Sequence, residues 1–517
     1  MADFRQSFVD ASGRMVPVII DEEGCYRAVK SKDQRFDGWF FVGVTSTGIF
    51  CRPSCPATTP RRANVRFYPT AAAAQGAGFR ACRRCRPDTA PGSPEWNVRG
   101  DLAGRAMGLI DDGLIDREGV AGVAARLAVS ERHLHRVLVQ ELGAAPLALA
   151  RSRRAQTARI LIETTDLPFT EIAFASGFAS IRQFNDTVRE FFGANPTTLR
   201  TDRTTSITRG RSGTRTPEPA AAGPTPISLR LATRGPFAGA ELMAFLAMRA
   251  IPGVESVDDD GTYHRVLRLP AGPATVSLRA EADHVSARLL LAELRDLGPA
   301  VARCRRLLDL DADPTAIDEA LGSDPLLAPL VDATPGRRSP GAVDGTELLV
   351  RAIIGQQVSV AGARTVAGRV AAVLGDPLPD PVLSAPSAPA GLAIAFPDAA
   401  ALAAADPTTF SMPRARGLAL TEACRLVAEG EVILDPGSDR EETERRLLAV
   451  KGIGPWTTAY LAMRALSDPD VFLPTDLGVL RGLANLGGPS DPKAAASLAE
   501  AWRPWRSYAL HHLWGAG

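Results

Sequence analysis

Four cysteines in an arginine-rich segment have the residue type and spacing that most clearly predict chemistry. Cys51 and Cys55 are separated by three residues, Cys82 and Cys85 by two, and 26 residues lie between the pairs. Closely spaced pairs let each half of a site chelate, and four thiolates form the closed tetrahedron that zinc favours. The spacing therefore predicts one zinc ion held by four thiolates.

The charge around these cysteines indicates a polyanionic partner. Residues 51–86 contain eight arginines and no Asp or Glu. Four thiolates against one Zn²⁺ carry a net charge of about −2, so the arginines favour nucleic acid as the partner. A purely structural zinc ribbon stays open as an alternative. Disulfides are less favoured, because no apolar signal stretch is seen and Cys25, Cys304 and Cys424 are scattered.

Length and composition limit the classes of protein that fit. A chain of 517 residues with a net charge of +1 is too long for one core and predicts two to four globular domains. No uncharged apolar run reaches about 18 residues, so we expect no membrane span and no membrane partner. Seven cysteines without a signal peptide predict the reducing cytoplasm. Residues 201–225, rich in Thr, Arg, Gly, Ser and Pro, predict a disordered linker between two halves.

The region before this linker has helical periodicity and paired helices. Ser130 is a predicted N-cap of one helix, and Ser180 with Gln183 forms a capping-box pattern before another. Another helix precedes each through a short turn, and residues 146–163 join the two pairs. This layout predicts two helix-turn-helix units.

The exposed face of each second helix carries the candidate DNA contacts. They are Arg132 and Arg136 on the first, and Arg182 and Asn185 on the second. Residues 101–200 hold 12 basic and 12 acidic side chains, so bulk charge does not separate DNA binding from a plain helical bundle.

Two stretches in this half resemble known families. The strings TSTGIFCRPSC, NVRFY and GFRACRRCRPD resemble the N-terminal domain of Ada-type regulators, and SGFASIRQFNDTVREFFGANPTTLR is similar to the end of AraC-type DNA-binding domains. The resemblance covers about residues 20–200. It implies that Cys51 accepts a methyl group from a DNA methylphosphotriester while Cys55, Cys82 and Cys85 remain zinc ligands. It also implies that methylation activates transcription, with promoter DNA and RNA polymerase as partners.

The half after the linker changes from strands to helices. Residues 226–300 alternate polar and apolar side chains, as short strands do, and the helical part contains the turn KGIGPW. Gly452 and Gly454 bracket that turn, and Pro455 suits the first helical position. Backbone amides there can hold a phosphate, although a simple packing turn fits the glycines too. Asp476, in VFLPTDLGVL, is by itself a helix N-cap candidate.

These motifs, with VRAIIGQQVSVAGAR, resemble AlkA-type 3-methyladenine DNA glycosylases of the helix-hairpin-helix superfamily. The resemblance spans about residues 226–515 and implies hydrolysis of the N-glycosidic bond of an alkylated base, without a cofactor. It makes Asp476 the catalytic carboxylate, which would stabilise the oxocarbenium-like sugar, and it makes Trp456 and Tyr460 the base pocket. Gly452 and Gly454 would contact DNA, as would Gln357, which stands where a relative uses an apolar wedge.

Two absences refine these expectations. Superfamily members that also cut the DNA backbone have a lysine where Trp456 stands, so we expect a monofunctional glycosylase. No Pro-Cys-His-Arg string occurs, so we expect no repair of O6-methylguanine. His264, His511 and His512 show no ligand spacing and are expected on the surface or on a helix face.

The expected fold is multidomain and mainly α with α+β parts. A zinc-binding methyl-acceptor domain is expected over 1–93, a double helix-turn-helix domain over 94–200, a small antiparallel α+β domain over 226–300 and a helix-hairpin-helix glycosylase domain over 301–517. The expected function is DNA alkylation repair joined to transcriptional control. The alternative is a DNA-binding regulator with a structural zinc domain and a non-catalytic, damage-binding C-terminal half.

Overall fold

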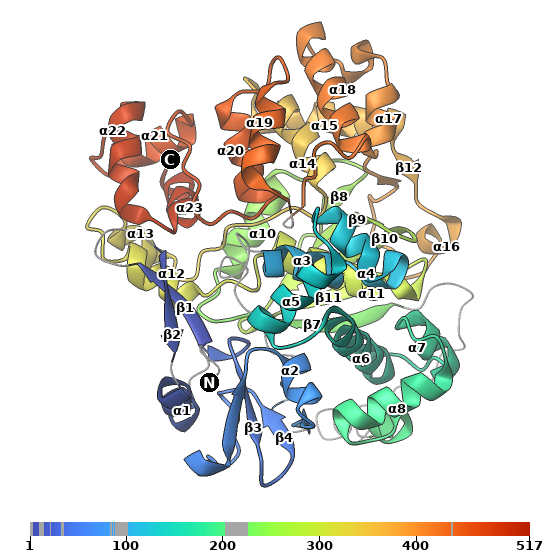
Figure 1. The fold of residues 1–517 in the computed structure, drawn as a ribbon. Coiled ribbons are helices and arrows are strands. Elements are labelled where there is room, and N and C mark those ends of the chain that lie inside the picture. Colours follow the sequence, from blue (N-terminus) through green and yellow to red (C-terminus); the bar gives the residue numbers. More distant parts are fainter. Residues whose placement is uncertain are drawn as a thin grey trace.

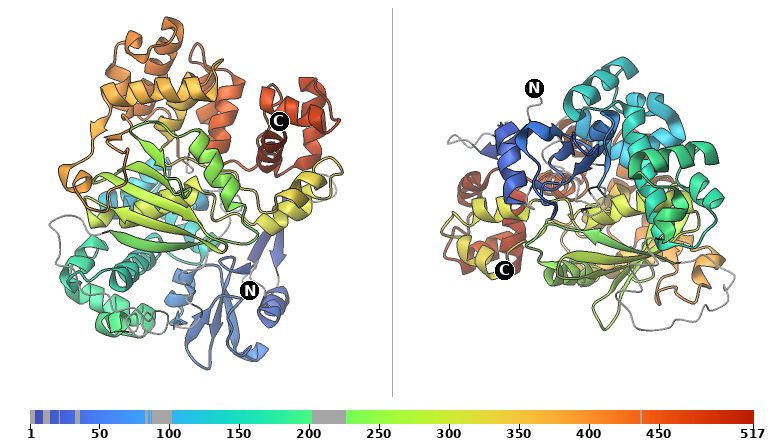
Figure 2. Two further views of the ribbon diagram at one scale, coloured as in Figure 1. Left: turned by 180° about the vertical axis from the view of Figure 1, so that it is seen from behind. Right: turned by 90° about the horizontal axis from the view of Figure 1, so that it is seen from below.

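A five-stranded sheet lies at the centre of the molecule, between two groups of smaller elements. The computed structural model describes residues 4–9, 15–20, 22–32, 36–82, 85, 87, 102–201, 226–435 and 438–517. The C-terminal helices lie on one side of this sheet, and the cysteine-containing module and its helical neighbour on the other (Figures 1 and 2). The expected fold class, multidomain and mainly α with α+β parts, is confirmed.

The cysteine module is built on a four-stranded sheet of order β5-β3-β4-β6. Strand β4 ends at Cys51, and β6, which runs parallel to it, ends one residue before Cys82. The amide of Cys82 donates to the carbonyl of Phe50 over 2.9 Å. Parallel pairing of these two strands therefore brings the two cysteine pairs to the same sheet end. The elements are β1 (Phe4–Val9), β2 (Met15–Ile20), α1 (Glu22–Ser31), β3 (Phe41–Val44), β4 (Ile49–Cys51), η2 (Arg62–Asn64), β5 (Val65–Tyr68), α2 (Ala71–Gly76) and β6 (Arg80–Ala81).

The expected pairs of helices follow, joined by one long helix. The Ser130 hydroxyl accepts from the amide of His133, which confirms the predicted N-cap. Ser180 caps the second unit through the amide of Gln183, but the Gln183 side chain accepts from the amide of Ala179 instead of closing a capping box on Ser180. The helices are α3 (Leu102–Asp111), α4 (Leu114–Arg126), α5 (Glu131–Leu142), α6 (Pro146–Thr164), α7 (Phe169–Ala175) and α8 (Ile181–Phe192).

The central sheet is antiparallel throughout, in the order β7-β11-β10-β9-β8. Four strands match the alternating segments of the sequence. The fifth, β8, has three residues, too few to show an alternation. The elements are β7 (Ile227–Ala232), α10 (Gly239–Met248), β8 (Glu255–Val257), β9 (Tyr263–Leu269), β10 (Gly272–Ala280), β11 (His284–Leu290), η5 (Leu294–Asp296) and α11 (Leu297–Leu307).

The C-terminal helices form two groups with separate cores, and helix α20 (Pro455–Arg464) packs into both. Its Leu461 belongs to the core around α14 and α18, and its Met463 to the core around α21 and α23. The other elements are α12 (Pro314–Leu321), α13 (Ala328–Ala333), α14 (Gly345–Ile354), α15 (Val360–Leu374), β12 (Asp376–Pro377), α16 (Asp380–Leu383), β13 (Ile394–Ala395), α17 (Ala399–Ala404), η6 (Pro407–Phe410), α18 (Arg414–Ala428), α19 (Arg440–Leu448), α21 (Leu477–Asn485), α22 (Pro492–Ala499), η7 (Glu500–Trp502) and α23 (Arg506–Ala516). Among the described helices, none has the length and apolar character needed to cross a membrane.

The two halves of the chain share a packed interface. Ala158 and Leu161 of α6 lie in the same buried cluster as Leu297 and Ala300 of α11. Elsewhere this interface has a partly open cavity of about 300 Å³, lined mostly by charged side chains from both halves. The linker expected over 201–225 lies outside the described residues, except for its first residue, which is helical.

Candidate functional sites

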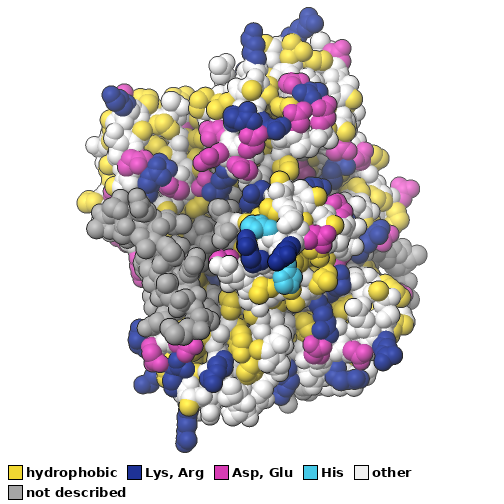
Figure 3. Space-filling view, viewed as in Figure 1, with side chains coloured by type: hydrophobic (Ala, Val, Ile, Leu, Met, Phe, Trp, Pro, Cys, Tyr) yellow, Lys and Arg dark blue, Asp and Glu magenta, His cyan; other side chains and the backbone are white. Residues whose placement is uncertain are grey.

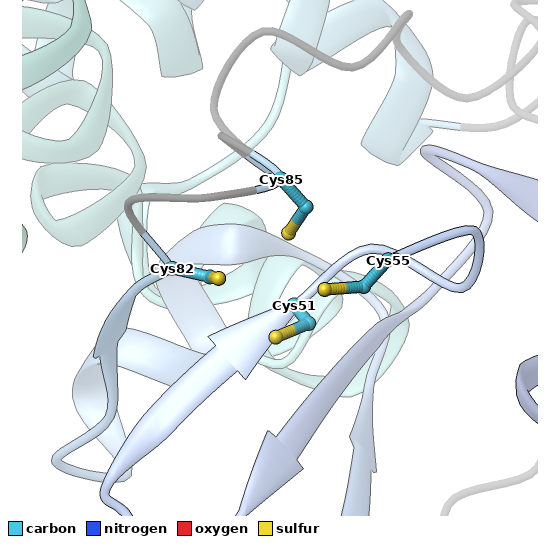
Figure 4. Close-up of side chains that lie close together, drawn as sticks. All are labelled: Cys51, Cys55, Cys82 and Cys85. Carbon is cyan, nitrogen blue, oxygen red and sulfur yellow. The ribbon is translucent and has the colours of Figure 1, made fainter. Parts of the chain in front are cut away.

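The four cysteines of the predicted zinc site converge. Their sulfur atoms all lie within 4.8 Å of one another, and Figure 4 shows the four side chains pointing toward a common centre. A zinc ion at about 2.3 Å from each of four sulfurs separates the sulfurs by about 3.8 Å. The donor set and its spacing therefore fit one tetrahedral zinc ion, held by residues that approach from β4, from the turn after it and from the segment after β6.

Crowding of four thiols makes them compete for protons. The neighbouring thiols, that of Cys55 foremost, raise the pKa of Cys51, while the contact with Cys51 lowers the pKa of Cys55 to about 7. The contacts of Cys82 with the thiols of Cys51, Cys55 and Cys85 lower the pKa of Cys82. Thiols this close share protons, and a dication that replaces those protons relieves the competition.

The cysteines differ in access to solvent. Cys82 and Cys85 are buried, with 8% and 4% of their surface exposed, whereas Cys51 and Cys55 are half-buried. A reactant that approaches from outside therefore meets Cys51 or Cys55 first.

Acidic side chains from outside residues 51–86 neutralise part of the arginine charge. Arg62 pairs with Glu22 and Glu23 at 2.6 and 2.8 Å, and Arg52 lies 3.3 Å from Asp37. No local pattern in the sequence predicts these pairs, because the acids lie at least 15 residues from their partners. Arg83, Arg84 and Arg86 lie outside the described residues.

The candidate DNA contacts of the helix-turn-helix units lie on the surface. Arg132 and Arg136 of α5 are exposed, and a guanidinium nitrogen of Arg136 lies 2.8 Å from Nδ1 of His133. In α8 the Arg182 side chain is 93% exposed, while Asn185 is half-buried. Figure 3 shows basic and histidine side chains gathered over α5. Three of the four candidates, Arg132, Arg136 and Arg182, are thus exposed on the surface.

The glycine turn between α19 and α20 has the expected shape. Gly452 has φ of +102°, a conformation that favours glycine, and Gly454 caps α20 with Pro455 as its first residue. The Gln356 side chain donates to the carbonyl of Gly452 at 3.1 Å and to the Thr457 hydroxyl at 3.0 Å. These bonds tie the glycine turn to the loop between α14 and α15.

Gln357, the next residue in that loop, is exposed and has φ of +60°. A non-glycine residue in this left-handed region is uncommon and carries backbone strain. The exposed side chain of Gln357 directly follows that of Gln356, which bonds to the glycine turn.

Asp476 is held by three donors. It caps α21 by accepting from the amide of Val479 at 3.0 Å, which confirms the expected N-cap. Its Oδ2 accepts from the indole nitrogen of Trp456 at 3.1 Å, and its Oδ1 from the indole nitrogen of Trp514 at 2.9 Å. The sequence did not identify Trp514 as a site residue, because its position on the last helix, 38 residues away, has no spacing relation to Asp476.

The two indoles that contact this carboxylate belong to a larger aromatic cluster. The ring centroids of Trp456 and Tyr460 lie 5.2 Å apart, and the two rings are stacked with an interplanar angle of 7°. The ring centroid of Trp514 lies 6.5 Å from that of Tyr460. Phe245 of α10 stacks on Trp514 at 6.3 Å. The central-sheet domain therefore supplies one ring, which sequence reasoning did not find because Phe245 precedes Gly452 of the glycine turn by 207 positions.

The three histidines do not lie on the surface, although His511 and His512 do lie on a helix, α23. His264, His511 and His512 are 5%, 4% and 2% exposed. His511 lies edge-on to Trp514 at 4.9 Å, and burial lowers its pKa well below the ordinary range. Residues 507–513 of α23 are all buried. Two adjacent polar side chains in the sequence therefore did not indicate that they are exposed.

Comparisons with known proteins match both halves of the chain. Three family models match: the metal-binding domain of Ada over 24–88, a helix-turn-helix domain over 123–202 and the AlkA N-terminal domain over 228–344. The chain is 35% identical to DNA-3-methyladenine glycosylase 2 of Escherichia coli over 54% of its length and 94% of that protein. Among solved structures, a 3-methyladenine DNA glycosylase from Archaeoglobus fulgidus is similar with a TM-score of 0.48 and 22% identity, over 55% of this chain and 97% of that one.

A relative in Mycobacterium tuberculosis aligns with both halves together. It is described as a probable bifunctional transcriptional activator/DNA repair enzyme AlkA, and it is 51% identical over 96% of each chain. The resemblances noted in the sequence, to Ada-type regulators and to AlkA-type glycosylases, are thereby confirmed. The chain belongs to the family of bifunctional transcriptional activator/DNA repair enzymes that join an Ada-type half to an AlkA-type half.

Proposed function

We propose that the C-terminal half hydrolyses the N-glycosidic bond of alkylated bases such as 3-methyladenine in double-stranded DNA. The observation that carries this proposal is the Asp476 carboxylate, held by Trp456 and Trp514 inside an aromatic cluster. N3-alkyladenine carries a positive charge, so it leaves as a neutral base without a strong general acid. A carboxylate that faces the developing cation on the sugar then supplies the main stabilisation of the transition state.

The aromatic cluster suits a cationic base. The stacked faces of Trp456 and Tyr460 attract positive charge, a contribution of about 0.5–2 kcal/mol. Because Trp456 stands where backbone-cutting relatives have lysine, the reaction stops at base release, which makes the enzyme a monofunctional glycosylase. The chemistry requires no cofactor in this half.

The glycine turn and the neighbouring loop would hold the DNA. Amides around Gly452 and Gly454, at the start of α20, suit a backbone phosphate. The exposed Gln357 would enter the gap left by the flipped nucleotide, whose extrusion costs a few kcal/mol. The bonds from Gln356 to this turn support joint action of the two segments.

We further propose that Cys51 accepts the methyl group of a DNA methylphosphotriester. Cys51, Cys55, Cys82 and Cys85 would hold one zinc ion, which when bound keeps the sulfurs as thiolates at neutral pH. Sulfur of Cys51 attacks the methyl carbon, the carbon–oxygen bond breaks, and the phosphodiester leaves with its negative charge. The half-buried position of Cys51 supports this assignment over the buried Cys82 and Cys85.

This transfer would also act as the transcriptional switch. Cys51 becomes a neutral thioether, so the cluster loses one negative charge and repels DNA phosphates less. The helix-turn-helix units, through Arg132, Arg136, Arg182 and Asn185, would then hold promoter DNA and bring RNA polymerase to it. Nothing in the reaction restores the thiol, so each chain transfers one methyl group.

The proposed division of labour follows the expected domains: 1–93 for methyl acceptance, 94–200 for promoter binding, and 226–300 with 301–517 for base release. The alternative is a regulator whose C-terminal half binds damaged DNA without hydrolysing the N-glycosidic bond, so it would release no free base. Incubating the protein with methylated duplex DNA separates the readings. We expect free 3-methyladenine by chromatography and one methyl on the peptide containing Cys51 by mass spectrometry. Binding without free base would overturn the glycosylase assignment, and an unmodified Cys51 would overturn the acceptor assignment.

A further inference from the structure

A buried arginine of the glycosylase half reaches into the cysteine module. A guanidinium nitrogen of Arg234, two residues after β7, donates to the main-chain carbonyl of Asp37 at 2.5 Å. The two residues are 197 positions apart. Arg234 is 6% exposed and Asp37 is 4% exposed, so this contact is shielded from water.

Asp37 in turn holds the loop between the first two cysteines. Its carboxylate accepts from the amide of Ser54 at 3.0 Å and from the Ser54 hydroxyl at 2.6 Å. Arg52 lies 3.3 Å from the same carboxylate. Arg52 follows Cys51 directly and Ser54 precedes Cys55, so Asp37 contacts both ends of the loop that spaces these two sulfurs.

The arginine is itself held firmly in the glycosylase half. Its guanidinium also donates to the carbonyl of Asp311 at 2.7 Å. Its own carbonyl accepts from Arg338 at 2.6 Å, and Arg338 is 2% exposed. Arg234 therefore connects a buried, hydrogen-bonded part of the glycosylase half, through Asp37, to the loop of the cysteine site.

We propose that Arg234 is a positioning residue for methyl transfer, by which the glycosylase half orients the Cys51–Cys55 loop. This inference rests on the proposed function of Cys51. Hydrogen bonds from a charged donor to a shielded carbonyl are stronger than those in water. Group transfer depends on sub-ångström placement of the reacting atom, so loss of this anchor slows attack by Cys51 sulfur. The site should also release zinc faster, because the loop carries two of its four ligands.

The coupling must act in both directions. If docking of the glycosylase half favours one loop arrangement, a change at the cysteine site alters the docking by the same free energy. The partly open cavity of about 300 Å³ elsewhere between the halves leaves part of this interface unpacked.

The test compares full-length variants at Arg234, which follows β7, and at Arg230, which lies on β7. Arg234→Met removes the donor and keeps the length of the side chain, and Arg234→Lys keeps a charge. Arg230→Met is the matched control, because Arg230 lies on β7 with its side chain 70% exposed and pairs only with Asp283 among the ion pairs of the described residues. The measurements are the single-turnover rate of Cys51 methylation on DNA that contains a methylphosphotriester, the rate of zinc transfer to a chromogenic chelator, and the excision rate of 3-methyladenine.

We expect Arg234→Met to slow methylation by about tenfold and to accelerate zinc loss, with excision within about twofold of the unmodified protein. Arg234→Lys should recover part of both losses, and Arg230→Met should match the unmodified protein. Unchanged methylation and zinc-loss rates in Arg234→Met would overturn the proposal.

A second variant covers the case in which Arg234→Met fails to fold. Ser54→Ala removes one bond to Asp37 on the surface side and should change methylation and zinc loss in the same direction by a smaller factor; no change would again overturn the proposal. The zinc readout also separates two failures. If Cys51 is never methylated, the proposed function fails, whereas faster zinc loss in Arg234→Met still shows that the glycosylase half holds the loop.

Discussion

The indole nitrogen of Trp514 lies 2.9 Å from Oδ1 of Asp476, although the two residues stand 38 positions apart. Trp456, which precedes Asp476 by 20 positions, donates to the other carboxylate oxygen, Oδ2. An ionised carboxylate only accepts hydrogen bonds, so these donors fix its orientation. The acid and the aromatic cluster consequently form one unit, in which the rings that would hold the base also position the carboxylate.

Asp476→Asn tests the carboxylate directly. Asn caps a helix about as well as Asp, so the fold should persist, while loss of the negative charge should slow base release by about a thousandfold, or ~4 kcal/mol. The measurement is single-turnover release of 3-methyladenine. Asp491→Asn, at the N-cap of α22, is the matched control and should excise normally. Normal excision by Asp476→Asn would remove Asp476 from the reaction.

Trp514→Phe tests the positioning of that carboxylate. The change keeps an aromatic ring but deletes the donor to Oδ1, a bond to a charged group that contributes about 1.5–3 kcal/mol. Excision should therefore fall about tenfold or more. Trp502→Phe deletes a similar indole–carboxylate bond, to Asp324 at 2.9 Å, away from the site. That control should lower the melting temperature without a comparable loss of excision; equal losses in both variants would contradict the positioning role.

Gln357 offers a test that separates stability from function. Gln357→Gly relieves a backbone at φ of +60° and should stabilise the fold by about 1 kcal/mol, yet it deletes the side chain that would fill the DNA gap. We expect a higher melting temperature with slower excision. Ser411→Gly, at φ of +51°, should give the stability gain alone. Faster or equal excision by Gln357→Gly would exclude insertion of this side chain.

Cys51→Ala should block methyl transfer while base release continues, because the two sites lie in different modules. Peptide mass spectrometry and chromatography measure the two outcomes on the same methylated duplex. Chelation of zinc should unfold the cysteine module, whose own core has only a few large side chains, and should leave excision intact. Cys424→Ala, a buried cysteine of the other half, should lose neither zinc nor methyl transfer. A methylated protein in the Cys51→Ala variant would identify another acceptor.

His512 predicts how stability depends on pH. Burial lowers its pKa to about 3, below the value of about 6.5 that it has when unfolded. The unfolded chain therefore binds the extra proton first, so the stability contributed by neutral His512 is present above pH 6.5 and is lost as the pH falls toward 3.

At pH 5 this loss amounts to about 2 kcal/mol. His512→Leu should show a smaller drop in melting temperature between pH 7.5 and pH 5 than the unmodified protein. His135→Leu, which changes an exposed histidine of α5, should show the same drop as the unmodified protein. An unchanged drop in His512→Leu would assign the acid sensitivity to other groups.

The sequence by itself determined the features that depend on neighbours in the chain. The cysteine spacing predicted the four-sulfur cluster, and Ser130 and Ser180 predicted the starts of α5 and α8. The pattern of Gly452, Gly454 and Pro455 predicted the turn before α20. Caps, turns and chelating pairs use bonds between residues a few positions apart, so residue type and spacing are sufficient to specify them.

Only the tertiary structure decided which distant groups meet. The contacts of Trp514 with Asp476 and of Arg234 with Asp37 join residues 38 and 197 positions apart. The burial of His511 and His512 depends on how α23 packs between α13 and α21. Such contacts follow from the way whole helices and sheets bury their apolar faces, and no local pattern records which side chains that packing brings together.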